Sequence, residues 1–166
     1  MRYTLNPAAS LATLANSPSG LLDIPTTELW ACHDRFVDLI PDRIAALTTL
    51  IDSGEDYSDW IPDASTDSLK TVGNWLQAHA TSRPVSGAEN DITNQRFWHP
   101  LPLPAEDLSE YTMSFVTDIG MYLSTVMLRH LPDCRWHLVL NDRRSINYGQ
   151  SVLTAGGVKS TLTLSG

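Results

Sequence analysis

Residues 104–140 decide how this chain folds, and they read PAEDLSEYTMSFVTDIGMYLSTVMLRHLPDCRWHLVL. Side chains suited to burial recur there at steps of three and four, the spacing that places them on one face of a helix. The stripe consists of Leu108, Tyr111, Phe115, Ile119, Tyr122, Val126 and His130, with Val116, Leu123 and Met127 widening it. Pro132 blocks continuation of the helix. The alternating segment 136–140 predicts a strand directly after it.

The ends and the middle of this helix carry further signals. Pro104 suits a first turn, where its missing N–H costs nothing, and Glu106 and Asp107 favour the positive end of the helix dipole. Gly120 in the interior costs about 1 kcal/mol relative to alanine. We expect Gly120 to be a packing contact, approached closely by the small pair Ala45–Ala46 of another helix.

Two more helices are predicted upstream of the long one. Apolar residues from about residue 26 to Ser53 keep the same spacing, with a kink or two abutting helices where Pro41 interrupts the pattern. A second helix is expected over residues 66–80, capped by Ser65 or Thr66. Before it, Trp60 and Ile61 are expected to fold back onto the core. Residues 1–25 are predicted to be an irregular arm.

A long loop and a small sheet complete the chain. Residues 81–103 are predicted to be a loop, functional or packed down by its own Phe97, Trp98 and Leu101. After the strand at 136–140, segments 145–154 and 158–164 favour two more strands, with Gly149 as a bulge or bend. The sequence therefore predicts one α+β domain over residues 1–166. Three to four helices, one of them long, precede a C-terminal antiparallel sheet of two to three strands.

Composition excludes several classes of function. The chain has 166 residues, 42% of them hydrophobic, which is enough for one real core. Its formal charge is -8, so its field should repel phosphate backbones and nucleic acid is not an expected partner. Asp118 interrupts the apolar run of the long helix, whose uncharged stretch is far short of the ~20 residues of a membrane span. The N-terminus lacks the apolar core of a signal peptide, so a cytoplasmic location is expected.

No motif predicts catalysis, a metal site or a cofactor. His130, Cys134 and His137 are zinc-ligand types within eight residues, but they fall on a helix, a turn and a strand without a close fourth ligand. In Gly156–Thr161 valine precedes the lysine, unlike a phosphate loop. Cys32, His33 and Asp34 are adjacent on a helix and do not face each other, and we expect Cys32 and Cys134 to be buried thiols. The acidic residues of segment 52–63 lack the spacing of a calcium loop.

Two patches resemble a set of uncharacterised bacterial proteins. One comprises Tyr57, the run Ser65–Lys70 and Asn74-Trp75-Leu76; the other comprises Asp118–Leu123, Trp136 and Asn147–Leu153. Together they cover about residues 57–154. The chain departs from those proteins at Ser124-Thr125, where they commonly carry Gly-Glu. The resemblance implies a shared α+β fold and supplies no activity or site to transfer.

These observations favour a non-enzymatic module that binds another protein or a second copy of itself. By analogy with small, acidic, metal-free bacterial domains, an immunity- or antitoxin-like role fits. The alternative is a small-ligand-binding protein or enzyme with its site between the long helix and the C-terminal sheet. A deep pocket would favour that alternative, and a flat apolar patch the module. The candidate binding residues are Trp98, His130, His137, Arg143 and Arg144.

Overall fold

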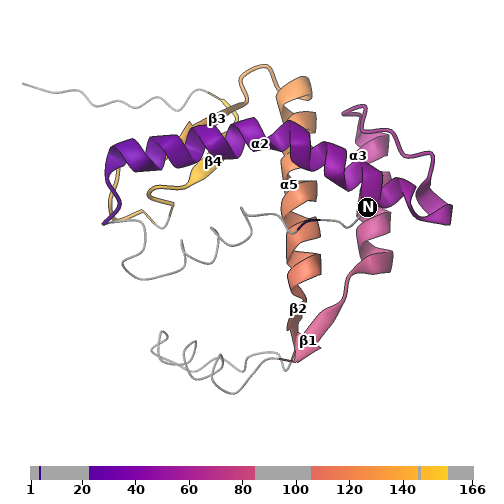
Figure 1. Ribbon diagram of the computed structural model, residues 1–166. Helices are drawn as coiled ribbons and strands as arrows, with labels where there is room; N and C mark the ends of the chain where they lie inside the picture. Colours follow the sequence, from indigo (N-terminus) through magenta and orange to yellow (C-terminus); the bar gives the residue numbers. More distant parts are fainter. Residues whose placement is uncertain (1–3, 5–22, 85–105, 146, 157–166) are drawn as a thin grey trace, which may run out of the picture.

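The computed structural model describes Thr4 and residues 23–84, 106–145 and 147–156. Within these ranges lie three α-helices and two small antiparallel sheets of two strands each, so the chain has the predicted α+β fold (Figure 1). Most of the predicted N-terminal arm, most of the 81–103 loop and the proposed 158–164 strand lie outside the described residues.

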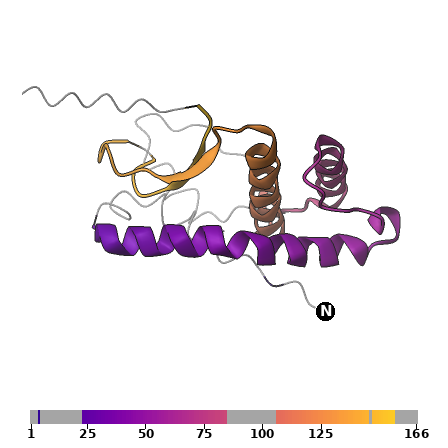
Figure 2. The ribbon, with the colours of Figure 1, turned by 90° about the horizontal axis from the view of Figure 1, so that it is seen from above.

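The longest element is α2, Thr26–Asp52, which lies across both halves of the molecule. Its first half lies over the C-terminal sheet, and its second half crosses the other two helices (Figures 1 and 2). The prediction of two abutting helices is wrong, because α2 continues through Pro41. Pro41 is exposed, while Ile40 and Arg43 beside it are buried and tie the helix to the core on both sides of the proline.

Helices α3, Thr66–His79, and α5, Glu110–His130, lie side by side and antiparallel (Figures 1 and 2). As predicted, Ser65 caps α3, and its hydroxyl accepts a hydrogen bond from Ser68 N at 3.0 Å. A short 3-10 helix η1, Glu55–Tyr57, connects α2 with this pair. The main core lies where the three helices meet and contains Leu47, Ile51, Trp60, Val72, Trp75, Tyr122 and Val126.

The start of α5 differs from the prediction. Residues 106–108 do not form its first turn but the strand β2, Glu106–Leu108, which pairs antiparallel with β1, Ser82–Pro84. The helix begins after Ser109, whose hydroxyl accepts a hydrogen bond from Thr112 N at 3.2 Å. Thr81 fixes this junction, because its N–H donates to Thr112 Oγ1 at 2.8 Å.

The C-terminal sheet pairs β3, Arg135–Leu138, with β4, Ser151–Thr154, in the register Arg135 with Thr154. Leu138 is buried with Leu29 of α2 and Tyr148 of the connecting turn. Gly149 in that turn has a φ of 75°, a left-handed conformation that glycine adopts at no steric cost, as its predicted bend requires. The predicted alternation along β3 is present, since Trp136 and Leu138 are less exposed than Arg135 and His137.

Candidate functional site

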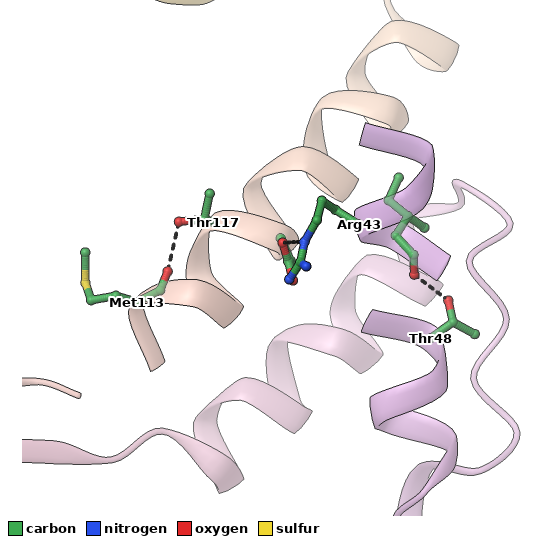
Figure 3. A network of polar contacts seen from close by, with 6 residues as sticks. Arg43, Thr48, Met113 and Thr117 are labelled. Carbon is green, nitrogen blue, oxygen red and sulfur yellow. Dashed lines mark hydrogen bonds and ion pairs between the residues drawn. The ribbon is translucent and has the colours of Figure 1, made fainter. Parts of the chain in front are cut away.

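The inward face of α5 is built around a buried ion pair. Asp118 is fully buried, and Arg43 of α2 binds it with two hydrogen bonds, Nε to Oδ1 at 3.0 Å and Nη2 to Oδ2 at 2.7 Å. Figure 3 shows Arg43 extending from α2 toward α5. A bidentate pair of this kind fixes the rotation of α5 about its axis, since any other rotation would bury a charge without its partner.

Other polar side chains on the inward face are also buried and hydrogen-bonded. The Tyr122 hydroxyl accepts a hydrogen bond from Ala64 N at 3.0 Å and is also hydrogen-bonded to Ser68 Oγ. Ser124 donates to the carbonyl of Met121 at 2.6 Å. The two Tyr122 bonds connect α5 with the start of α3, whereas the Ser124 bond lies within α5. These hydrogen bonds explain how small polar residues occupy a buried face without the penalty of unpaired groups.

The opposite face of α5 is apolar and exposed. Its residues are Met113, Val116, Gly120, Leu123 and Met127, which we call the outward stripe; Met127 is half-buried and the other four are exposed. Met113 and Val116 are each 39% exposed and Leu123 is 40% exposed. At 3.6 residues per turn the stripe lies roughly opposite Asp118. In Figure 3 the Met113 side chain extends away from α5 on the side opposite Arg43.

No described helix or strand covers the outward stripe. Figure 2 shows α5 nearly end-on, with α2 along one side and α3 beside it, and the side away from α2 faces outward. Between Tyr111 and Leu128 the one charged residue is Asp118, and that residue is buried. The solvent-facing side of a surface helix normally carries charged or polar residues. The outward stripe therefore has the composition of an interface.

Gly120 lies in the middle of the outward stripe, and the predicted packing notch is absent. A Cβ atom built on Gly120 would meet nothing within 4 Å. Gly120 and Ala45 are both exposed, so the small pair on α2 does not contact it. The reason is the rotation of α5, because Asp118 rather than Gly120 faces α2. No contact among the described residues explains a glycine at this position.

The residues predicted to bind a ligand do not converge. His130 lies at the end of α5, where Nε2 is 3.0 Å from the carbonyl oxygen of Ala64, while His137 is exposed on β3. Arg143 and Arg144 lie in the turn between β3 and β4. There Arg143 Nε donates to the Tyr148 hydroxyl at 3.5 Å, and this hydrogen bond raises the pKa of the guanidinium. Trp98 lies outside the described residues.

The region between α5 and the C-terminal sheet contains packed rings. Trp136 of β3 stacks edge-on against Phe36 of α2, with ring centroids 5.0 Å apart, and both pack beside Ile40 and Met121. Trp136 Nε1 is the one buried side-chain nitrogen or oxygen without a hydrogen-bond partner in the described part of the chain.

Besides the Arg43–Asp118 ion pair with α5, α2 has a polar contact with the C-terminal sheet. His33 is buried, and its Nδ1 lies 2.9 Å from Ser151 Oγ on β4. The neighbouring Cys32 is exposed, so its prediction as a buried thiol is wrong, whereas Cys134 is buried as expected. Trp30 lies edge-on to His33, with centroids 5.5 Å apart. The His33–Ser151 contact joins α2 to β4.

An open acidic cleft lies beside η1 and the start of α3. Its volume is about 400 Å³, and its lining includes Asp56, Asp59, Asp63 and Asp67. Hydrogen bonds from Ser65 lower the pKa of the Asp63 carboxyl. Trp60 is buried in the cleft wall as predicted, but Ile61 is 70% exposed and does not fold back onto the core. The cleft should repel anions.

The described residues contain neither a metal-binding cluster nor a membrane-spanning helix. No group of three or more histidine, cysteine, aspartate or glutamate side chains there is arranged to hold a metal ion. No helix in the same residues is long and apolar enough to cross a membrane. The acidic cleft thus brings carboxylates near one another without making them a cation site.

Comparisons with protein-family models, with curated proteins and with solved structures found no match. The resemblance to uncharacterised bacterial proteins therefore stays a prediction.

Helical spacing alone does not separate the outward stripe from the inward one. Val116, Leu123 and Met127 fit the spacing of the inward stripe, so the sequence predicts that they widen it. The signal that could have separated them is the recurrence at 113, 116, 120, 123 and 127. That series follows steps of three and four on its own and includes the glycine.

Proposed function

We propose that this chain is a non-enzymatic protein-interaction module that binds through the outward stripe of α5. One observation carries the proposal: an uncharged helix face stays exposed while the same helix buries its charge. Contiguous apolar surface of this kind is typical of protein-binding sites. A formal charge of -8 elsewhere on the chain keeps the module soluble while this face is free.

An immunity- or antitoxin-like role is the form of binding that we favour. In such a role a small acidic chain covers a surface of a second protein, and no catalytic residues of its own are needed. The support is analogy in size, charge and exposed helix face. The alternative, a ligand site between α5 and the sheet, has the unpartnered Trp136 Nε1 in its favour. That nitrogen lies among packed apolar rings, so the outward stripe supports the module better.

Site-specific photo-cross-linking in cells of the native host tests the proposal. A photoreactive residue is placed at Met113 or Leu123 on the outward stripe, and at Ile61 as an exposed apolar control away from it. We expect a protein adduct from the two stripe positions and none from Ile61. The adduct from Met113 should disappear when Leu123→Glu is added, because a charge there must be desolvated on binding.

Either of two results would contradict the proposal. Equal adducts from Ile61 and the stripe, or adducts that survive Leu123→Glu, would mean that α5 offers no specific surface. The proposed function would then be wrong.

A further inference from the structure

We infer that the outward stripe binds a second copy of this chain, with the two α5 helices antiparallel and crossing at Gly120. The inference rests on the proposed function, because it names the partner of the same surface. Three features of α5 carry it: the position of the glycine, the symmetry of the stripe about it, and the charges at the two ends of the helix.

Gly120 is the midpoint of α5, which spans Glu110–His130. A glycine there weakens the helix by about 1 kcal/mol relative to alanine, and no described neighbour benefits from the missing side chain. A second helix does benefit, since small residues at a crossing point let two backbones approach closely. Two-fold symmetry makes the midpoint the place where one copy meets the same residue of the other.

The stripe is self-complementary about that midpoint. Met113 and Met127 each lie seven residues from Gly120, on opposite sides. In an antiparallel pair, Met113 of each copy lies beside Met127 of the other, and Val116 lies at nearly the height of Leu123 of the other copy. The paired length from Met113 to Met127 is about 21 Å at 1.5 Å per residue. A two-fold interface requires this matching of a patch with itself.

The ends of α5 differ in charge. The N-terminal end carries the exposed acidic residues Glu106, Asp107 and Glu110 together with Arg83. At the C-terminal end, Arg129 and Arg135 are balanced by Asp133 and by Asp63, which lies beside Arg129. Antiparallel pairing places the acidic N-terminal end of each copy near this mixed end of the other and opposes the helix dipoles. Parallel pairing would place the two acidic ends together.

The rest of the fold leaves room for this arrangement. Because Asp118 binds Arg43 on the opposite side of α5, α2 lies on the far side of each helix from the second copy. In Figure 2 the described helices and strands leave the side of α5 away from α2 open. Two copies can therefore approach through α5 without moving a described element.

Sedimentation equilibrium of the purified full chain over a wide concentration range is the first experiment. We expect a reversible monomer–dimer equilibrium, weakened at least tenfold in dissociation constant by Leu123→Glu and unchanged by the control Ile61→Glu. Both variants add the same charge at an exposed apolar position, so net charge does not separate them. A chain that stays monomeric at all concentrations overturns the inference.

Cysteine cross-linking tests the orientation. The Cys32→Ser background removes the exposed native thiol. In this background the Met113→Cys chain and the Met127→Cys chain are each oxidised alone, and an unoxidised mixture of the two is oxidised in parallel. Antiparallel pairing predicts disulfides between the two variants in the mixture and few within either one alone. Rapid self-linking of Met113→Cys alone indicates parallel pairing and overturns the assigned geometry.

Sedimentation of the purified chain and photo-cross-linking in cells together distinguish a failure of this inference from a failure of the proposed function. A monomer in sedimentation, together with stripe-specific photo-adducts to a different protein in cells, rejects the second copy and retains the module. A monomer without stripe-specific adducts rejects both.

Discussion

The two faces of α5 differ in where their polar and apolar side chains lie. The inward face buries the polar residues Thr112, Ser114, Asp118 and Ser124 together with Met121, Tyr122 and Val126, whereas the outward face exposes the apolar residues Met113, Val116 and Leu123. Buried polar groups are stable only when hydrogen-bonded, and Thr112, Asp118 and Ser124 meet that condition. Exposed apolar groups become buried only when a partner arrives. The difference shows that polar contacts set the rotation of α5 and leave its apolar side available.

The largest effect should come from the charge on the inward face. Asp118→Ala removes both carboxylate acceptors of the buried Arg43 guanidinium. Breaking a buried ion pair from one side typically costs about 3–5 kcal/mol. We expect a loss of that size in the free energy of unfolding, measured by urea denaturation.

A double substitution provides the control for this ion pair. Arg43→Met added to Asp118→Ala should cost less than the sum of the two single changes, because neither charge is then left behind. A loss below about 1 kcal/mol for Asp118→Ala would mean that the pair does not hold α5 in its observed rotation. The contrast between the two faces would then lose its physical basis.

The next effect compares adjacent residues on opposite faces. Tyr122→Phe removes the hydroxyl that accepts from Ala64 N and binds Ser68, and leaving such groups unsatisfied costs about 1–3 kcal/mol. The control Leu123→Ala, one residue along, should change the unfolding free energy by no more than about 0.5 kcal/mol. Both are measured at low chain concentration. Similar losses at the two positions would show that Leu123 is packed within the monomer.

Much of the fold follows from sequence patterns, but the rotation of α5 does not. Periodicity predicted α3, α5 and the strand at Trp136, and it correctly assigned Phe115, Ile119 and Tyr122 to the core. It could not choose between two apolar stripes on one helix, because both satisfy the same spacing. The choice depends on Arg43, which lies 75 residues earlier in the chain.

The sequence could not predict the short strands β1 and β2 or the exposed outward stripe, and the reasons are related. Strand β1 has three residues and ends in Pro84, so its pattern is weak. Its partner β2 lies more than twenty residues away, and the pairing exists because Thr81 bonds to the first turn of α5. Exposure of a stripe is likewise a property of what packs elsewhere. The local sequence of a helix therefore does not predict which of its apolar stripes stays exposed.

The smallest change on the outward face has effects of opposite sign on two measurements. Gly120→Ala adds a methyl group that would meet nothing within 4 Å, so the monomer gains helix propensity without overpacking. We expect the free energy of unfolding to rise by up to about 1 kcal/mol, measured by urea denaturation at low chain concentration. Ser124→Ala on the inward face is the matched control, because it removes a buried hydrogen bond from the same helix.

The same variant should weaken self-association, because the added Cβ atoms meet at the helix crossing and hold the two backbones apart. A more stable chain that dimerises less well cannot be explained by general damage to the fold, since damage would lower both quantities. If Gly120→Ala instead destabilises the monomer, a segment packs on Gly120 within the chain. The outward face would then be an internal contact, and the contrast with the inward face would reduce to two buried sides of one helix.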